Sequence, residues 1–151
     1  MAEPPVFFIT VKGSASNIRE YMKYSIHSIL FLRGVHPGSD FVTEIYNGVP
    51  FMVSRNAGNH FIDEDLSYIQ DAIMDPFHHA SRNITYVFSL ETMARDAELE
   101  RWEFQIMPQF DDNAGEGKEN PSTSTISEDQ IQIEILDIMR QILEVVTETS
   151  N

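Results

Sequence analysis

Histidines and carboxylates are the side chains in this 151-residue chain that could hold a metal ion or transfer a proton. The five histidines are His27, His36, His60, His78 and His79. No two of them have the HxxxH or HExxH spacing that places two imidazoles on one face of a helix, and the chain has no cysteine. We therefore predict neither a metal site nor a cofactor, and we interpret His27 as a helix residue rather than a ligand.

Motifs for nucleophilic catalysis and phosphate binding are also missing from the sequence. It has no GxSxG turn that would expose a serine nucleophile, and no GxxxxGKS/T or GxGxxG loop. Residues 63–65 are acidic, but negative charge at the start of a predicted helix is explained by the helix dipole. The sequence favours a non-enzymatic binding module, and the alternative is a small acidic hydrolase that uses the scattered histidines.

The composition limits what this chain can bind. It carries 24 acidic and 10 basic residues, a formal charge of −14 that repels phosphate backbones, so we predict no direct nucleic-acid binding. No apolar run approaches the roughly 18 residues of a membrane span, and residues 1–13 lack the features of a secretory signal, so we expect no membrane association. The length and the 42% hydrophobic content predict a single domain over residues 1–151, and the lack of cysteine favours a reducing compartment.

The strongest structural signal is an amphipathic helix within residues 14–41. Its apolar residues recur with helical spacing at Ile18, Met22, Ile26, Ile29 and Leu30. Asn17 and Glu20 have the spacing of a capping box at its start. At its end, Gly34 can take the left-handed conformation and Pro37 prevents continuation. We expect the rest of the chain to pack around this helix.

A β-hairpin and a second helix follow in the sequence. Asn47-Gly48 is a strong signal for a type I′ turn between strands at 42–46 and 49–53, and Pro50 places the second strand at an edge. Residues 59–80 then show helical periodicity. The apolar face comprises Ile62, Leu66, Ile69, Ile73 and Phe77. Because proline lacks a backbone donor, Pro76 is expected to kink or end this helix near Asp75.

Three further strands are predicted, at 6–11, 84–90 and 99–106. In the last of them, apolar residues alternate with polar ones at Trp102, Phe104 and Ile106. This alternation predicts one buried face and one solvated face, as in an antiparallel sheet. Residues 91–98 are interpreted as a polar connector, and residues 108–126 as a flexible loop because they have little apolar content.

A third helix is predicted from Ser127 to about Thr147, with Ser127 and Gln130 as a capping box. Its apolar stripe comprises Ile131, Ile135, Ile138, Ile142 and Val145, flanked by Leu136, Met139, Leu143 and Val146. So wide an apolar arc indicates a helix that is buried on most sides or shared with a partner, with Arg140 and Gln141 on the polar face. The predicted fold class is α+β, with three helices packed on an antiparallel sheet and a small edge hairpin.

Three segments of this sequence carry a family resemblance: ITVKGSASNIREYMKYSIHSILFLRGVHPGSDF at 9–41, LERWEF at 99–104 and IMRQI at 138–142. Together they resemble the HORMA-domain family, and most of all its spindle-assembly-checkpoint branch of mitotic arrest deficient proteins. The segments occur in the family's order and are separated by elements of the family's type. The resemblance therefore extends over about residues 6–147.

The resemblance implies a non-enzymatic adaptor that binds other proteins. Family members hold a partner segment under a mobile C-terminal safety belt and switch between open and closed topologies. For this chain it implies a dimerisation face at Arg140 and Gln141 and a contribution from Arg33. It also implies that the strand carrying Trp102 and Phe104 is the edge against which the safety belt or a bound peptide pairs. The implied partners are checkpoint proteins of the mitotic arrest deficient and anaphase-promoting-complex activator types, a second copy or a full-length relative. The implied location is the nucleus and cytoplasm, and the kinetochore in mitosis.

The sequence departs from the family pattern after its last helix. Family domains continue there with further strands and the safety belt, whereas this sequence stops at Asn151. We therefore expect a C-terminally truncated HORMA-like domain whose C-terminal strands are missing. The alternatives are an adaptor of the meiotic chromosome axis or of a translesion DNA polymerase, or a truncated product without peptide-binding activity.

Overall fold

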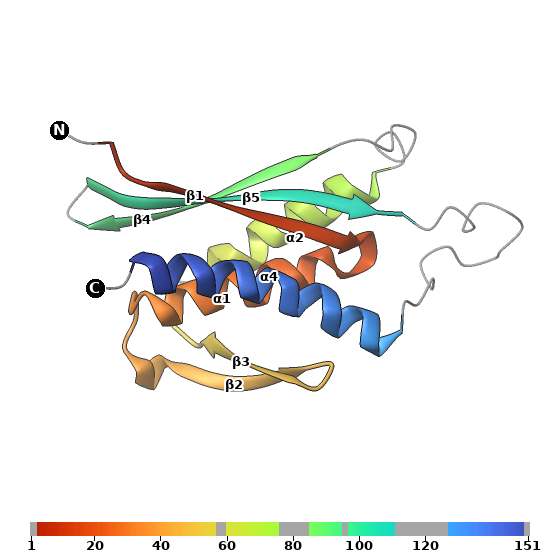
Figure 1. Ribbon diagram of the computed structural model, residues 1–151, viewed down its shortest axis with the longest axis horizontal. Coiled ribbons are helices and arrows are strands. Elements are labelled where there is room, and N and C mark those ends of the chain that lie inside the picture. Colours follow the sequence, from red (N-terminus) through yellow and green to blue (C-terminus); the bar gives the residue numbers. More distant parts are fainter. Residues whose placement is uncertain (1–2, 57–59, 76–84, 95–96, 111–126, 150–151) are drawn as a thin grey trace, which may run out of the picture.

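The computed structural model describes residues 3–56, 60–75, 85–94, 97–110 and 127–149. Within these residues, three α-helices pack with a three-stranded sheet and a separate two-stranded hairpin (Figure 1). The helix α1 (Ile18–Leu32) lies between the sheet and the hairpin. The predicted α+β class and its three helices are thus confirmed.

The main sheet contains β1 (Val6–Ser14), β4 (Tyr86–Ala94) and β5 (Ala97–Gln109) in the order β1-β5-β4. β4 and β5 are antiparallel, whereas β1 runs parallel to β5 and places Phe7 beside Trp102. The sheet is therefore mixed, and the expectation of an antiparallel sheet is corrected for the pair β1 and β5. These two strands are connected through helices and other strands, and such a long connection allows parallel pairing, which a tight hairpin does not.

The strands β4 and β5 are longer than predicted. The interpretation of 91–98 as a connector is wrong for most of its length, since β4 continues to Ala94 and β5 begins at Ala97. Polar residues there are compatible with strand because one face of the sheet is solvated. β5 also continues through Pro108 to Gln109, and Phe110 packs against the core, so the predicted loop begins later than expected. Residue 84 and residues 111–126 lie outside the described part of the chain.

Helix α1 is shorter than the segment predicted for it, because Ser14 belongs to β1 and a 3₁₀ turn occupies Ala15–Asn17. The predicted cap is not formed: Asn17 has helical dihedrals (φ −106°, ψ −5°), not the extended conformation in which a side chain caps a helix, and it makes no such bond. The predicted end is confirmed, since Gly34 has φ +65°. α1 buries almost its whole length, as expected of the central helix.

The hairpin consists of β2 (Phe41–Tyr46) and β3 (Val49–Ser54), which pair only with each other in the described residues. Asn47 has φ 48° and Gly48 has φ 82°, as a type I′ turn requires, so the predicted hairpin is confirmed. α1 holds the base of the hairpin through a buried contact in which the Ser54 N–H donates to His27 Nδ1 at 3.1 Å.

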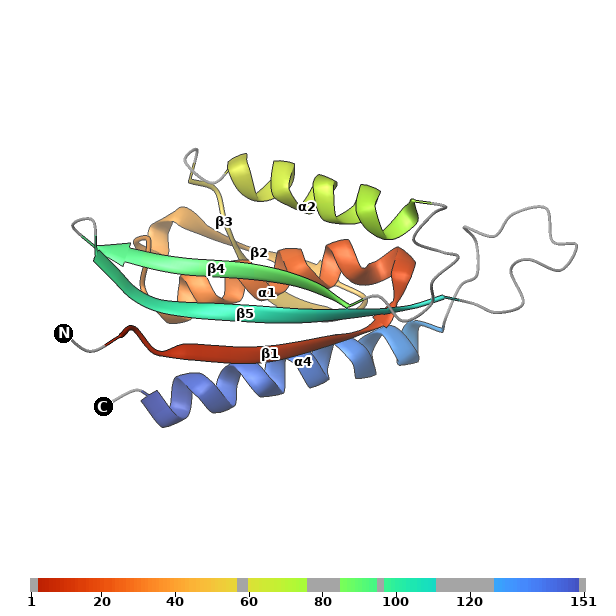
Figure 2. The same ribbon diagram turned by 90° about the horizontal axis from the view of Figure 1, so that it is seen from above.

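Two more helices flank α1, as Figure 2 shows. α2 (His60–Met74) lies on the side of β4, and α4 (Glu128–Thr149) runs alongside β1. The predicted second helix extended to residue 80, but residues 76–80, which include Pro76, lie outside the described part of the chain. None of the described helices is long and apolar enough to cross a membrane.

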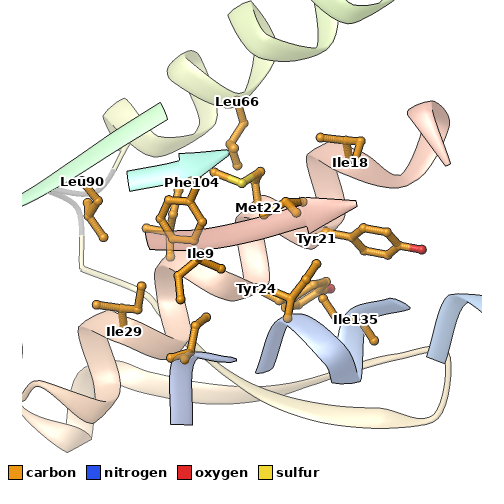
Figure 3. Packing of buried hydrophobic residues seen from close by; sticks show 14 of the residues in the cluster. Ile9, Ile18, Tyr21, Met22, Tyr24, Ile29, Leu66, Leu90, Phe104 and Ile135 are labelled. Atoms are coloured by element: carbon orange, nitrogen blue, oxygen red, sulfur yellow. The ribbon is translucent and has the colours of Figure 1, made fainter. Parts of the chain in front are cut away.

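One hydrophobic core joins these elements. Figure 3 shows Ile9 and Phe104 from the sheet facing Met22 of α1, with Leu66 of α2 on one side and Ile135 of α4 on another. All five side chains are at most 1% exposed. The helices α2 and α4 therefore pack against the sheet and α1 together, and this contact determines which face of α4 remains open to solvent.

Candidate protein-binding surface on helix α4

The start of α4 follows the sequence signal. The Gln130 N–H donates to Ser127 Oγ at 3.1 Å, which is the N-cap bond, and Glu128 and Asp129 occupy the first turn, where negative charge suits the helix dipole. The Gln130 side chain does not complete the predicted capping box, because its Nε2 donates to Glu134 Oε2 at 3.2 Å. One stripe of α4 is buried, and its residues are Ile135, Ile138 and Ile142.

The opposite flank of α4 is apolar and open. Leu136 is 49% exposed and Leu143 is 50% exposed, although they lie on the same helix as the buried stripe. Together with charged neighbours they line a groove formed by Leu136, Met139, Arg140, Leu143, Glu144, Thr147 and Glu148. The interpretation that α4 is buried on most sides is therefore wrong, because sheet and α1 cover only one stripe. Its alternative, sharing with a partner, stays a prediction.

Arg140 lies in this groove and faces solvent. Its guanidinium donates to Glu144 Oε1 at 2.7 Å and to Asp137 Oδ1 at 2.8 Å, both on α4. The hydrogen bonds that the guanidinium donates to these two carboxylates raise the pKa of Arg140, so the guanidinium stays charged at any physiological pH. A charged, planar group held beside two exposed leucines suits recognition of another protein surface.

Gln141 is the residue after Arg140, but its side chain points to the flank of α4 that faces β1. Its Oε1 accepts the Thr10 N–H at 2.8 Å, and its Nε2 donates to the Thr10 carbonyl at 2.9 Å. The side chain is thus occupied by β1. The structure therefore separates the two residues that were predicted together: Arg140 lies in the open groove and Gln141 lies against the sheet.

A second polar contact lies two turns earlier on the same flank of α4. Glu134 Oε1 accepts from the Tyr21 hydroxyl at 2.6 Å and from the Ser14 N–H at 3.4 Å. Burial, followed by the hydrogen bond to Glu134, raises the pKa of Tyr21, so the hydroxyl remains a donor. The sequence pattern did not point to Glu134 or Tyr21, because nothing in their spacing along the chain shows that they meet.

Arg33 follows the last residue of α1 and lies beside the C-terminal end of α4. Its Nε is 3.0 Å from Glu100 Oε1, and its Nη2 donates to Thr149 Oγ1 at 2.7 Å. The guanidinium also stands over the Trp102 ring, 5.5 Å from its centroid. Arg33 therefore joins α1, β5 and α4 within the chain, and its predicted contribution to partner binding stays a prediction.

Trp102 and Phe104 are both 0% exposed. They occupy the inward face of β5, which pairs with β1 on one side and β4 on the other. The expectation that this strand is an edge for peptide pairing is corrected, because among the described strands β1 and β4 form the edges of the sheet and β5 lies between them. Side chains alternate between the two faces of β5, and this alternation places both residues in the core. In this conformation, therefore, neither side chain contacts a partner directly.

Other kinds of site have no support in the described residues. They contain no group of three or more histidine, aspartate or glutamate side chains that could hold a metal ion. His78 and His79 lie outside the described part of the chain.

A comparison with known protein families matches the HORMA domain over residues 14–151. This chain belongs to the HORMA domain family. The resemblance that the sequence motifs carry is thereby confirmed, and the HORMA fold is seen again in a solved chain of the "Crystal Structure of Mitotic Checkpoint Complex". That chain matches with a TM-score of 0.56 and 22% identity, over 88% of this chain and 63% of that one.

Curated relatives of this HORMA domain are spindle-checkpoint proteins by name. The "Mitotic spindle checkpoint component mad2" of Schizosaccharomyces pombe is 27% identical over 141 residues, which is 91% of this chain and 64% of the relative. The "Mitotic spindle assembly checkpoint protein MAD2A" of Homo sapiens is 28% identical over 139 residues, which is 92% and 63%. This chain thus spans less than two thirds of the length of these relatives.

Proposed function

We propose that this HORMA domain is a non-enzymatic adaptor of the spindle assembly checkpoint that binds another protein through the open groove on α4. The observation that carries the proposal is the half-exposed pair Leu136 and Leu143, with the charged Arg140 between them. The names of the relatives support the checkpoint setting. We further propose that the protein is found at kinetochores in mitosis and otherwise in nucleus and cytoplasm.

The groove has the arrangement of a helix-docking site. Leu136, Met139 and Leu143 follow one another at steps of three and four residues, so they form a single seam along α4. Burying the exposed half of two leucines contributes about 1 kcal/mol each, because full burial of a leucine contributes about 1.5–3 kcal/mol. This gain is smaller than the cost of bringing two proteins together, so a stable complex requires further contacts around the groove.

We propose that the occupant of the groove is the equivalent region of another HORMA domain, either a second copy of this chain or a full-length relative. A helix related by two-fold symmetry would place Leu136 and Leu143 against their counterparts. Arg140 would then lie near Glu144 or Asp137 of the other copy, so that a basic group meets acidic ones.

The test introduces the same charge at two positions on α4. Leu143→Lys places an ammonium in the groove, whereas Ile133→Lys places it at an exposed site on the same helix outside the groove. Self-association is measured by sedimentation, and binding to full-length Schizosaccharomyces pombe mad2 by calorimetry. We expect Leu143→Lys to weaken association at least tenfold, a loss of about 1.4 kcal/mol, and Ile133→Lys to leave it within twofold.

A second variant tests the charged contact. Arg140→Glu reverses the charge in the groove and is compared with Arg140→Gln, which only removes it. We expect a larger loss of affinity for the reversal, because it places a third carboxylate beside Asp137 and Glu144. Equal affinity for the unaltered chain, Leu143→Lys and Arg140→Glu would refute the groove as the docking site. Folding of each variant is checked by urea denaturation.

A further inference from the structure

Among the strands that the structure describes, β1 forms one edge of the main sheet, and the backbone groups on its two sides can be assigned. The Arg101 N–H donates to the Pro5 carbonyl at 2.9 Å, so in this parallel pair the odd-numbered residues of β1 face β5. The N–H and C=O of the even-numbered residues therefore face away from the sheet. A long exposed edge of this kind invites unwanted pairing with another strand.

Gln141 covers this edge at Thr10. Its amide places an N–H donor and a carbonyl acceptor in one plane, as a peptide group does, and it uses both on the backbone of a single residue at 2.8 and 2.9 Å. The same Nε2 also donates to Asp137 Oδ2 at 3.3 Å within α4. Both distances to Thr10 are those of well-formed N–H···O bonds. The side chain therefore takes the place that a neighbouring strand would take beside Thr10.

Glu134 makes the second contact with the same edge, at Ser14. It precedes Gln141 by seven residues, or about 10 Å along a helix, while Ser14 follows Thr10 by four residues, or about 13 Å along a strand. α4 thus runs antiparallel to β1. Gly13 permits the approach, since a Cβ at this position would lie 2.7 Å from Glu134 Oε1.

These contacts determine how α4 is rotated about its axis. At 100° per residue, Gln141 and Glu134 lie on one flank of the buried stripe, and Leu136 and Leu143 lie on the other. A rotation that moved Gln141 away from Thr10 would also move the leucines relative to the surface. Two anchors along the helix resist such a rotation better than the apolar stripe alone, because apolar packing has little directionality.

We infer that Gln141 is a positioning residue, whose amide pairs with the edge of β1 in place of a strand and thereby holds α4 in the rotation that presents Leu136, Arg140 and Leu143. The part that concerns partner binding rests on the proposed function. In that part, Gln141 affects binding through its bonds to Thr10, without contact with the partner.

The first experiment needs no partner and measures amide hydrogen exchange by NMR on the whole chain. Phe8 and Lys12 are the matched controls, because their N–H groups face the same way as that of Thr10 and have no partner on α4 in the described residues. We expect the Thr10 amide to exchange at least tenfold more slowly than theirs. In Gln141→Met, which keeps the length but loses both polar groups, Thr10 should exchange as they do. Equal exchange of the three amides in the unaltered chain would overturn the inference.

The second experiment removes one of the two bonds, the one that the Thr10 N–H donates, from the side of β1. Thr10→Pro deletes the N–H that Gln141 accepts, and Lys12→Pro deletes an equivalent N–H that α4 does not use, while both leave the bonds to β5 intact. We expect Gln141→Met, which loses both bonds, and Thr10→Pro, which loses one, each to weaken binding to full-length Schizosaccharomyces pombe mad2 by a factor of three or more, and Lys12→Pro to leave it unchanged.

The outcomes separate this inference from the proposed function. If Leu143→Lys abolishes binding while Thr10→Pro and Gln141→Met leave it unchanged, the groove is used but Gln141 does not position it, and the inference fails. If no groove variant alters binding, the proposed function fails, and the exchange of the Thr10 amide alone decides whether the strand-like pairing exists. Loss of binding in Gln141→Met but not in Thr10→Pro would show that the Thr10 N–H does not transmit the effect of Gln141, and would also overturn the inference.

Discussion

Glu100 accepts two hydrogen bonds at one oxygen: its Oε1 lies 3.0 Å from Arg33 Nε and 3.0 Å from Trp102 Nε1. The Arg33 and Glu100 side chains are only 16% and 14% exposed, so solvent and salt screen this ion pair less than a surface pair. A single carboxylate thus links the end of α1 to the core of the sheet. Arg33 extends the link to Thr149 at the end of α4.

We predict that Glu100→Ala destabilises the protein by about 2–4 kcal/mol, because it leaves a largely buried guanidinium and a buried indole N–H without their shared acceptor. Glu100→Gln keeps an acceptor for Trp102 and should cost less. Urea denaturation followed by the fluorescence of the single tryptophan gives both values. Equal destabilisation by the two variants would show that the lost charge, and not the lost acceptor, dominates.

The sequence was sufficient to predict most of the elements, because local signals determine them. The Asn47-Gly48 turn, the end of α1 at Gly34 and the alternation around Trp102 are properties of neighbouring residues, and all three are found. The sites were less predictable because they depend on distant pairs. Gln141 and Thr10 are 131 residues apart, and no periodicity shows that the amide of one meets the backbone of the other. Likewise, the alternation of apolar and polar residues predicted that Trp102 lies on the buried face of a strand, but it could not show that this strand is central in the sheet.

Gly13 offers a prediction about the junction between β1 and α4. Gly13→Ala should destabilise the protein by about 1–3 kcal/mol, since overpacking a tight site has this cost. The added Cβ would lie 2.7 Å from both Glu134 Oε1 and Tyr21 Cε2, and the ring of Tyr21 is fully buried and cannot move aside. Thermal unfolding measures the effect.

Gly38→Ala is the control for this substitution. Gly38 has nothing within 4 Å of the added Cβ and no positive φ, so alanine there should be neutral or stabilise by up to about 1 kcal/mol through the unfolded chain. If both alanine variants melted at the same temperature, the close approach of Glu134 to Gly13 would not exist in solution.

His27 predicts a pH dependence of stability. Burial, and then the charge of Lys23 on the same helix, lowers the pKa of His27, while Asp63 of α2 and Glu44 of β2 oppose the shift. The unfolded chain therefore takes up a proton at higher pH than the folded chain. The contribution of neutral His27 is full above its ordinary pKa of about 6.5 and is lost as the pH falls through this value toward the folded pKa.

The structure gives the reason, because only neutral Nδ1 can accept the Ser54 N–H that holds β3. His27→Gln keeps an acceptor and does not titrate. We expect the free energy of unfolding of the unaltered chain to fall relative to that of His27→Gln between pH 7 and pH 5. The carboxylates are common to both proteins and cancel in the difference, so a constant difference over this range would contradict the prediction.

Substitution of Trp102 tests whether a buried residue affects partner binding only through the stability of the core or through direct contact with the partner. Trp102→Phe leaves a smaller ring in the same inward position and removes the N–H that Glu100 accepts. We predict a loss of about 1–3 kcal/mol in stability, in the range of core substitutions that reduce volume.

At a temperature where the Trp102→Phe variant remains folded, its affinity for full-length Schizosaccharomyces pombe mad2 should stay within twofold of the unaltered chain. The reason is that Trp102 is fully buried and contributes nothing to the groove on α4. A tenfold loss of affinity in the folded variant would mean that β5 becomes exposed during binding, so that the partner meets a conformation other than this one.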